Sequence, residues 1–109
     1  MAVVPASTVT IAQMAAHLNG AAADADVIRW YAEAKLLTAD VFAQAWRDVP
    51  VEVVDDVVYR VGRALKDSGK KAATGAGQVA VTDGSPSRVP ADPYASSYAL
   101  IRRYVVLGL

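Results

Sequence analysis

The chain contains no cysteine and only one histidine, His17, among its 109 residues. The absence of cysteine excludes disulfides, thiolate nucleophiles and cysteine-based metal sites. A histidine-dependent triad or metal cluster would rest on His17 alone. Its place near the end of a predicted helix, where a cation suits the helix dipole, favours a structural or solvent-exposed role. The sequence therefore predicts no catalytic residues, no metal site and no cofactor, and we do not expect an enzyme.

Net charge is also lacking, since 11 Lys and Arg residues balance 11 Asp and Glu residues. A general nucleic-acid binder carries a basic excess, because neutralising phosphates supplies most of its affinity. The charges are nevertheless uneven along the chain. Nine of the 11 acids precede Ser68, whereas five basic residues face two acids after it. An acidic body and a basic end favour head-to-tail contacts between identical subunits.

The sequence has no apolar run as long as a transmembrane helix, and the start Met1–Pro5 lacks the charged region of a signal peptide. We therefore expect a protein made in the cytoplasm, without a membrane partner. Yet 54% of the residues are hydrophobic and the mean hydropathy is +0.25. This excess favours apolar subunit contacts. A tightly packed, alanine-rich monomer is the alternative.

The first half of the chain predicts an extended segment, residues 1–9, and two helices. Thr10 and Gln13 have the spacing of a capping box, and Asn19-Gly20 is a typical helix end. A second helix is predicted from Ala25 to Ala45, with Asp24 as its N-cap. Apolar residues outside its main stripe predict that this helix is covered on more than one side; they are Ile28, Leu36 and Phe42.

A third helix is predicted to start at Pro50 and to end at Gly69. Its valines lower helix propensity, but they recur every 3.6 residues rather than every second residue. Residues 69–92 are rich in Gly, Ala, Ser and Pro and predict a long loop. A short β-hairpin about Asp83-Gly84 is possible within this loop.

A fourth helix is predicted to start at Asp92-Pro93 and to continue through Arg102. The apolar tail 104–109 is predicted to dock, either on the core of the chain or on a partner. We expect deletion of residues 104–109 to leave the fold intact and to abolish docking. The predicted fold is a single domain, 1–109, that is mainly α: a small bundle of about four helices with a long loop and an extended C-terminal tail.

Two short motifs match enzymes by chance. Ser68-Gly69-Lys70-Lys71 has the Ser-x-x-Lys spacing of some acyl-transfer enzymes, but no companion motif accompanies it. Residues 75–80 match G-x-G-x-x-A, but they follow a predicted helix rather than a strand, so we reject a dinucleotide site.

The order of these features resembles the head–tail connector (adaptor) proteins of long-tailed bacteriophages. The matching pieces are a short helix, a long helix opening with acids, a helix announced by proline, a variable loop and a proline-started last helix. In this chain they read TIAQMAAHLNG, DADVIRWYAEAKLLTADVF, VPVEVVDDVVYRVGRALKDS and, after the loop, DPYASSYALIRRYVVLGL. The resemblance covers residues 8–105, and its most specific parts are Val49-Pro50 and Leu100–Tyr104. The long Gly/Ala loop departs from the family pattern.

The resemblance implies a homo-oligomeric ring, about twelve-fold, in the neck of the virion. Such a ring binds beneath the portal protein, extends the DNA channel and joins the capsid to the next neck protein or the tail terminator. Double-stranded DNA passes through it without sequence-specific binding. Made in the host cytoplasm, the chain would be a structural protein that works by binding and geometry.

The resemblance also implies where the contacts lie. The C-terminal part is expected to contact the portal or another partner through Tyr98, Ile101, Arg102, Arg103, Tyr104, Val105, Val106, Leu107 and Leu109. The loop region is expected to face a neighbouring subunit or the channel through Lys70, Lys71, Gln78, Val79, Val81 and Arg88.

Other functions fit the same helices. A small helical DNA-binding or regulatory protein is one alternative, although the turn between the second and third helices is atypical for a helix-turn-helix and the third helix starts with acids. Another neck or tail-completion protein, or a toxin–antitoxin interaction module, is a further alternative.

Overall fold

The computed structural model describes the backbone of residues 2–74 and 92–106 and the side chains of residues 2–68 and 92–106. Within these ranges the fold is all-helical, as predicted. It consists of four α-helices, and a 3₁₀ turn, η2, leads directly into the last of them. The elements are α1 (Ile11–His17), α2 (Ala25–Phe42), α3 (Val51–Thr74), η2 (Ala95–Ser97) and α5 (Tyr98–Ile101). The possible β-hairpin lies outside the described residues.

Helix α1 begins and ends where the sequence predicts. The Thr10 hydroxyl accepts a hydrogen bond from the Gln13 amide at 3.2 Å, and the Gln13 side chain accepts one from the Thr10 amide at 2.9 Å, which completes the capping box. After the helix, Asn19 adopts a left-handed conformation with φ of 57°. At the neighbouring Gly20, a Cβ atom would lie 2.9 Å from the Val27 side chain. Asn19 and Gly20 therefore let the chain turn tightly into α2.

Helix α2 has the predicted cap but ends earlier than predicted. The Asp24 carboxylate accepts a hydrogen bond from the Asp26 amide at 2.8 Å. The helix ends at Phe42 rather than Ala45. The Trp46 amide instead donates to the Tyr104 carbonyl at 2.9 Å, so the C-terminal segment supplies the hydrogen bond that the next helical turn would have made.

Helix α3 starts at Val51, one residue later than predicted, and the predicted end at Gly69 is wrong. The helix continues through Gly69 to Thr74. A glycine ends a helix only when it takes a left-handed conformation, and inside a helix it costs about 1 kcal/mol relative to alanine. The four residues that follow, Lys-Lys-Ala-Ala, are good helix formers, and they continue the helix.

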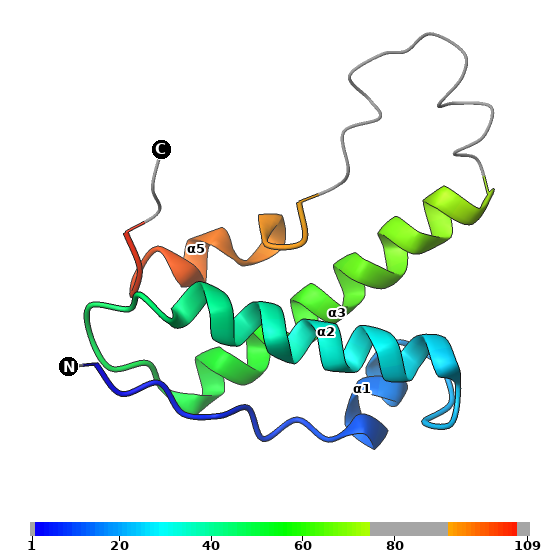
Figure 1. Ribbon diagram of the computed structural model, residues 1–109, viewed down its shortest axis with the longest axis horizontal. Helices are drawn as coiled ribbons and strands as arrows, with labels where there is room; N and C mark the ends of the chain where they lie inside the picture. The colour runs from blue at the N-terminus through cyan, green and yellow to red at the C-terminus, as the bar shows by residue number, and fades with distance from the viewer. Residues whose placement is uncertain (1, 75–91, 107–109) are drawn as a thin grey trace, which may run out of the picture.

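Helices α2 and α3 form the body of the molecule, with α2 crossing in front of α3 in Figure 1. Helix α1 packs at one end, the N-terminal segment runs below α2 in this view, and η2 and α5 lie above it. The core is centred on a valine stripe of α3, which the sequence predicts. The fully buried residues of the core are Val57, Val58 and Val61 of this stripe, together with Met14, Leu18, Ala34, Phe42 and Ile101 from other parts of the chain.

The N-terminal segment is extended, as predicted, and it is held by side chains of the helical body. The Asp55 carboxylate of α3 accepts hydrogen bonds from the Ser7 hydroxyl and the Thr8 amide, both at 2.8 Å, and from the Thr8 hydroxyl. The Tyr31 hydroxyl of α2 donates to the Val9 carbonyl at 2.8 Å. The segment is therefore an ordered layer of the fold, and Val9 is buried.

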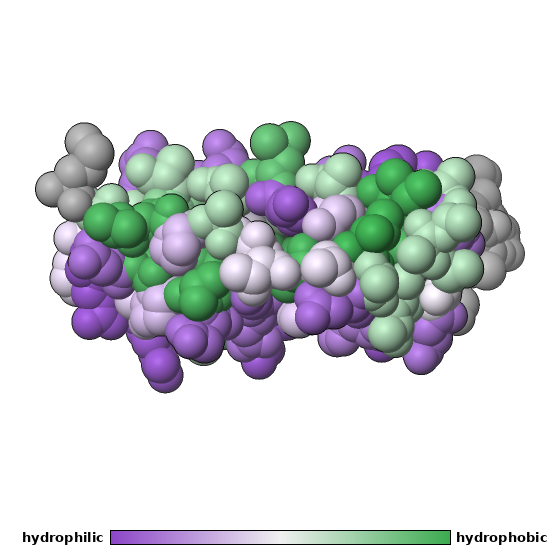
Figure 2. Space-filling model, turned by 90° about the horizontal axis from the view of Figure 1, so that it is seen from below, coloured by the Kyte–Doolittle hydropathy of each residue, from purple (hydrophilic) through white to green (hydrophobic). Residues whose placement is uncertain are grey.

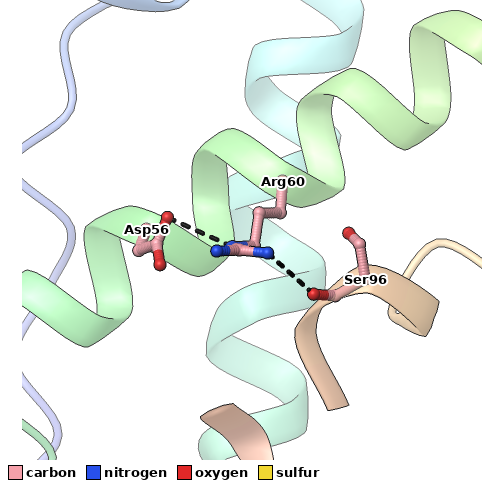
Figure 3. A network of polar contacts seen from close by, with 3 residues as sticks. All are labelled: Asp56, Arg60 and Ser96. Carbon is pink, nitrogen blue, oxygen red and sulfur yellow. Dashed lines mark hydrogen bonds and ion pairs between the residues drawn. The ribbon is translucent and has the colours of Figure 1, made fainter. Parts of the chain in front are cut away.

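The predicted fourth helix is shorter than expected. Asp92 accepts a hydrogen bond from the Tyr94 amide at 2.9 Å, but the chain then forms the 3₁₀ turn η2, and α5 ends at Ile101. The serines of η2 have only moderate helix propensity, and the 3₁₀ turn is tied to α3. Figure 3 shows this tie: Arg60 donates to the Ser96 carbonyl at 3.0 Å and pairs with Asp56 at 3.2 Å.

Candidate interaction surfaces

The C-terminal segment contributes to the core of its own subunit. Ile101 is fully buried, and Tyr104 and Val105 are only 8% and 6% exposed. Tyr104 packs its ring edge-on against Phe42, with 6.3 Å between ring centroids. These three predicted partner contacts are therefore core residues in this conformation. Deletion of residues 104–109 would remove two of these buried side chains, so from the structure we expect that deletion to destabilise the fold as well as to abolish docking.

Arg47 fixes the C-terminal segment against the turn between α2 and α3. Its guanidinium lies 4.6 Å from the ring centroid of Tyr104 and 5.2 Å from that of Trp46. Its Nε donates to the Arg103 carbonyl at 2.9 Å. A cation–π contact at an exposed site such as Arg47 contributes about 0.5–1 kcal/mol. The backbone of residues 103–104 is consequently held in one place, and this orients the neighbouring side chains.

Next to these buried anchors lie exposed side chains of a different kind. Arg102 and Arg103 are exposed, Val106 is 80% exposed and Trp46 is 59% exposed. We name Trp46, Arg102, Arg103 and Val106 the C-terminal patch. Arginine and tryptophan are enriched at protein interfaces and their hot spots. Tyr98 lies at the edge of this region, half-buried, and its hydroxyl donates to the Asp92 carboxylate.

A groove runs between the N-terminal segment and the second half of α2. It consists of two adjoining hollows of about 570 and 360 Å³, and both are lined by Val4, Phe42 and Ala43. Figure 2 looks at the face that carries the N-terminal segment and shows apolar groups in separate patches among polar ones. The hydroxyl of Thr38, at the wall of the smaller hollow, is buried and forms no hydrogen bond. The Ser7 hydroxyl, in the wall of the smaller hollow, donates to the Asp55 carboxylate and so helps to hold the N-terminal segment on α3.

Asp55 and Tyr94 have pKa values that their surroundings shift, and both form hydrogen bonds within the fold. Burial raises the pKa of Asp55, but hydrogen bonds from Thr8, Ser7 and Val9 outweigh it, so the pKa lies below its ordinary value. Burial, with the nearby carboxylates of Asp40 and Asp92, raises the pKa of Tyr94. The Tyr94 phenol therefore stays protonated and donates to the Leu37 carbonyl at 3.1 Å.

His17 is exposed and its ring lies tilted against that of Tyr59, with 4.9 Å between ring centroids. Within residues 2–68 and 92–106, no group of three His, Cys, Asp or Glu side chains is arranged to hold a metal ion. No helix in the part of the chain that the structure describes is long and apolar enough to cross a membrane. The turn from α2 to α3 spans residues 43–50, longer than the three or four residues typical of a helix-turn-helix.

The outer face of α2 was misread from the sequence. Ile28 and Leu36 were expected to be covered, but they are 46% and 68% exposed, and only Phe42 of the three is buried. The exposed face of α2 has its own sequence pattern, in which Ala alternates with large apolar residues on one side of the helix. This pattern is hard to separate from the core stripe of α2, because that stripe is apolar too.

The remaining predicted contact residues cannot be placed. Lys70 and Lys71 lie in the last turns of α3, where the structure describes only the backbone. The other predicted residues lie outside the described part of the chain; they are Gln78, Val79, Val81, Arg88, Leu107 and Leu109.

Comparison of the chain with protein families, with curated proteins and with solved structures finds no match. In residues 2–74 and 92–106 the structure defines a small all-helical protein with an extended N-terminal segment packed on its helices. Exposed large apolar side chains lie in the C-terminal patch, beside its two arginines, and on the outer face of α2.

Proposed function

We propose that the chain is a structural head–tail connector, or adaptor, of a tailed bacteriophage, and not an enzyme. One observation carries the proposal: the C-terminal patch stands directly on buried anchors, with Arg102, Arg103 and Val106 exposed beside Tyr104 and Val105. A connector needs such a surface, because it must hold two assemblies together through preformed contacts. The order of helices and caps that resembles the connector family supports the same function.

In this proposal the C-terminal patch contacts the portal protein. Arg102 and Arg103 would pair with acidic groups of the portal, and Val106 would fill an apolar hollow there. Because Arg47 and the buried Tyr104 hold the backbone of this segment, few bonds must be frozen on binding, which reduces its entropic cost. The work done is recognition and alignment, and no covalent bond changes.

The proposed assembly is a ring of about twelve copies in the neck of the virion. It would extend the channel through which double-stranded DNA passes, and its far side would receive the next neck protein or the tail terminator. The zero net charge of the chain fits a channel wall that lets DNA pass without holding it. Lys70, Lys71 and the 75–91 region would face a neighbouring subunit or the channel.

The test is binding to the portal protein from the same genome, measured by biolayer interferometry. The paired change Arg102→Glu and Arg103→Glu, and separately Val106→Asp, should weaken binding at least roughly ten-fold, as loss of an interface hot spot does. Glu33→Lys reverses an exposed charge on α2 and serves as the control, which should bind normally. Circular dichroism checks that each variant folds. Unchanged binding by both patch variants would remove the C-terminal patch from the proposal.

A further inference from the structure

The outer face of α2 carries exposed apolar side chains along its whole length. They are Ala25, Ile28, Ala32, Leu36, Ala39 and Ala43. At 3.6 residues per turn, these positions fall within an arc of about 80°. The helix has 18 residues and is therefore about 27 Å long. A stripe of this kind on a helix normally packs against another helix.

No described part of the chain covers this face. Figure 1 shows α2 in front of α3, with the N-terminal segment below and α5 above. The shortest dimension of the molecule is 16 Å, which leaves room for about two helix layers. Ile28 and Leu36 are accordingly 46% and 68% exposed.

We propose that the outer face of α2 binds the same face of a second copy, with the two helices antiparallel about a two-fold axis near residue 34. In this arrangement the numbers of facing residues add up to between 67 and 69. Leu36 then faces Ala32 of the partner subunit, Ile28 lies beside Ala39 of the partner subunit, and Ala25 faces Ala43 of the partner subunit. Leu36 and Ile28 thus each meet an alanine, so the surface is complementary to itself.

The charges beside the stripe select this register. Arg29 and Asp40 lie on the same flank of α2, on the side of α5. In an antiparallel two-fold pair, equal flanks meet each other. Arg29 pairs with Asp26 of its own helix at 3.3 Å. The proposed register also brings Arg29 of each copy close to Asp40 of the partner subunit, so each Arg29 lies between two carboxylates. Glu33 lies farther round the same flank, outside the contact.

A parallel pair lacks these advantages. It would set Leu36 against the partner's Leu36 and Ile28 against the partner's Ile28, with the alanines opposite each other. The flank that holds Arg29 and Asp40 would meet the opposite flank, whose charged residue is Lys35. The antiparallel arrangement is therefore the one that matches both size and charge.

This pairing goes beyond the proposed connector function. A two-fold contact closes on itself, whereas a polar ring needs head-to-tail contacts that repeat around it. The pair is accordingly a state of the free chain. One helix pair of this length buries less than the roughly 1,200–2,000 Å² of stable complexes, so the pair is weak and reversible.

Cysteine cross-linking tests the geometry, since the chain has no cysteine and each variant carries a single thiol. A mixture of Ala25→Cys and Ala43→Cys proteins should form the mixed disulfide roughly ten-fold faster than either protein forms its own, because pairing raises the effective concentration of the two thiols. Faster cross-linking of Ala25→Cys to itself would show a parallel pair and overturn the proposal. Equal rates for all three disulfides would show that no defined pair exists, and would overturn it as well.

Charge reversal tests the same register without thiols. Arg29→Asp or Asp40→Arg alone should weaken pairing roughly five-fold in sedimentation equilibrium, and the double variant should restore it. Glu33→Gln is the control and should not weaken pairing. Equal association of the two single variants, the double variant and the Glu33→Gln control would contradict the register. Portal binding is measured separately, so a failed pairing test leaves the connector proposal standing, and the reverse also holds.

Discussion

Two adjacent acids of α3, Asp55 and Asp56, have different roles, and the difference gives a sharp prediction. Asp55 accepts three hydrogen bonds from Ser7 and Thr8 and so holds the N-terminal segment on the body. Asp56 forms one ion pair with Arg60, in which both side chains are nearly half exposed. We predict that Asp55→Ala costs much more stability than Asp56→Ala.

The magnitude follows from the contacts. A net hydrogen bond contributes about 0.5–1.5 kcal/mol, and three bonds to one partly exposed carboxylate together give about 2 kcal/mol. An exposed ion pair between residues four apart on a helix contributes about 0.3–0.5 kcal/mol. For a domain of this size, the larger loss lowers Tm by about 8 °C and the smaller by no more than about 2 °C. Urea denaturation followed by circular dichroism measures both losses in the free energy of unfolding.

The effect of Asp55 should also depend on pH. Its pKa in the folded chain is lowered, so its contribution is complete above the pKa of the unfolded chain, about 3.9, and is lost as pH falls through the lower folded value. The stability difference between the native protein and Asp55→Ala should therefore be constant from about pH 7 to pH 5 and shrink below about pH 4. Equal losses for Asp55→Ala and Asp56→Ala at pH 7 would refute the reasoning.

Three further substitutions test the core. Thr38→Val should raise the free energy of unfolding by about 1 kcal/mol, because it removes a buried hydroxyl that forms no hydrogen bond. Ile101→Ala should lower it by about 3 kcal/mol, since Ile101 is fully buried, and a loss below about 1 kcal/mol would mean that the C-terminal segment is not docked. Gly62→Leu should lower the free energy of unfolding by at least about 2 kcal/mol, because even the Cβ atom of a side chain at this position would lie 2.7 Å from the buried Met14 sulfur. Urea denaturation measures the change for all three variants.

Local signals in the sequence predicted much of the fold. Thr10 with Gln13, and Asp24, mark helix starts through side-chain hydrogen bonds to the backbone, and the structure confirms both starts. Pro50 marks the third start through its fixed dihedral angle, one residue before α3 begins. The valine stripe of α3 was equally clear, because its apolar and charged residues separate cleanly around the helix.

Helix ends were predicted less well, because they depend on contacts between distant residues. The end of α2 is set by a hydrogen bond from Trp46 to Tyr104, which no local pattern contains. Gly69 is a strong local stop signal, yet α3 continues past it. A glycine stops a helix only if the following residues gain more elsewhere, and the sequence alone does not show that balance.

The candidate surfaces were predicted only in part. The sequence showed that the tail was too apolar to be free in solvent, but it left open whether the tail packs on its own core or on a partner. The structure separates these residues: Tyr104 and Val105 pack inward, whereas Val106 faces solvent. On α2, Ile28 and Leu36 were expected to be covered, because an exposed apolar face and a buried one have the same periodicity.

The connector proposal is tested most directly by native mass spectrometry of the chain mixed with portal protein from the same genome. The account predicts a defined complex in which about twelve copies are bound to the portal ring. The same complex should be lost with the Arg102→Glu and Arg103→Glu pair. A chain that stays free in the presence of folded portal rings, at concentrations well above those of the rings, would contradict the account.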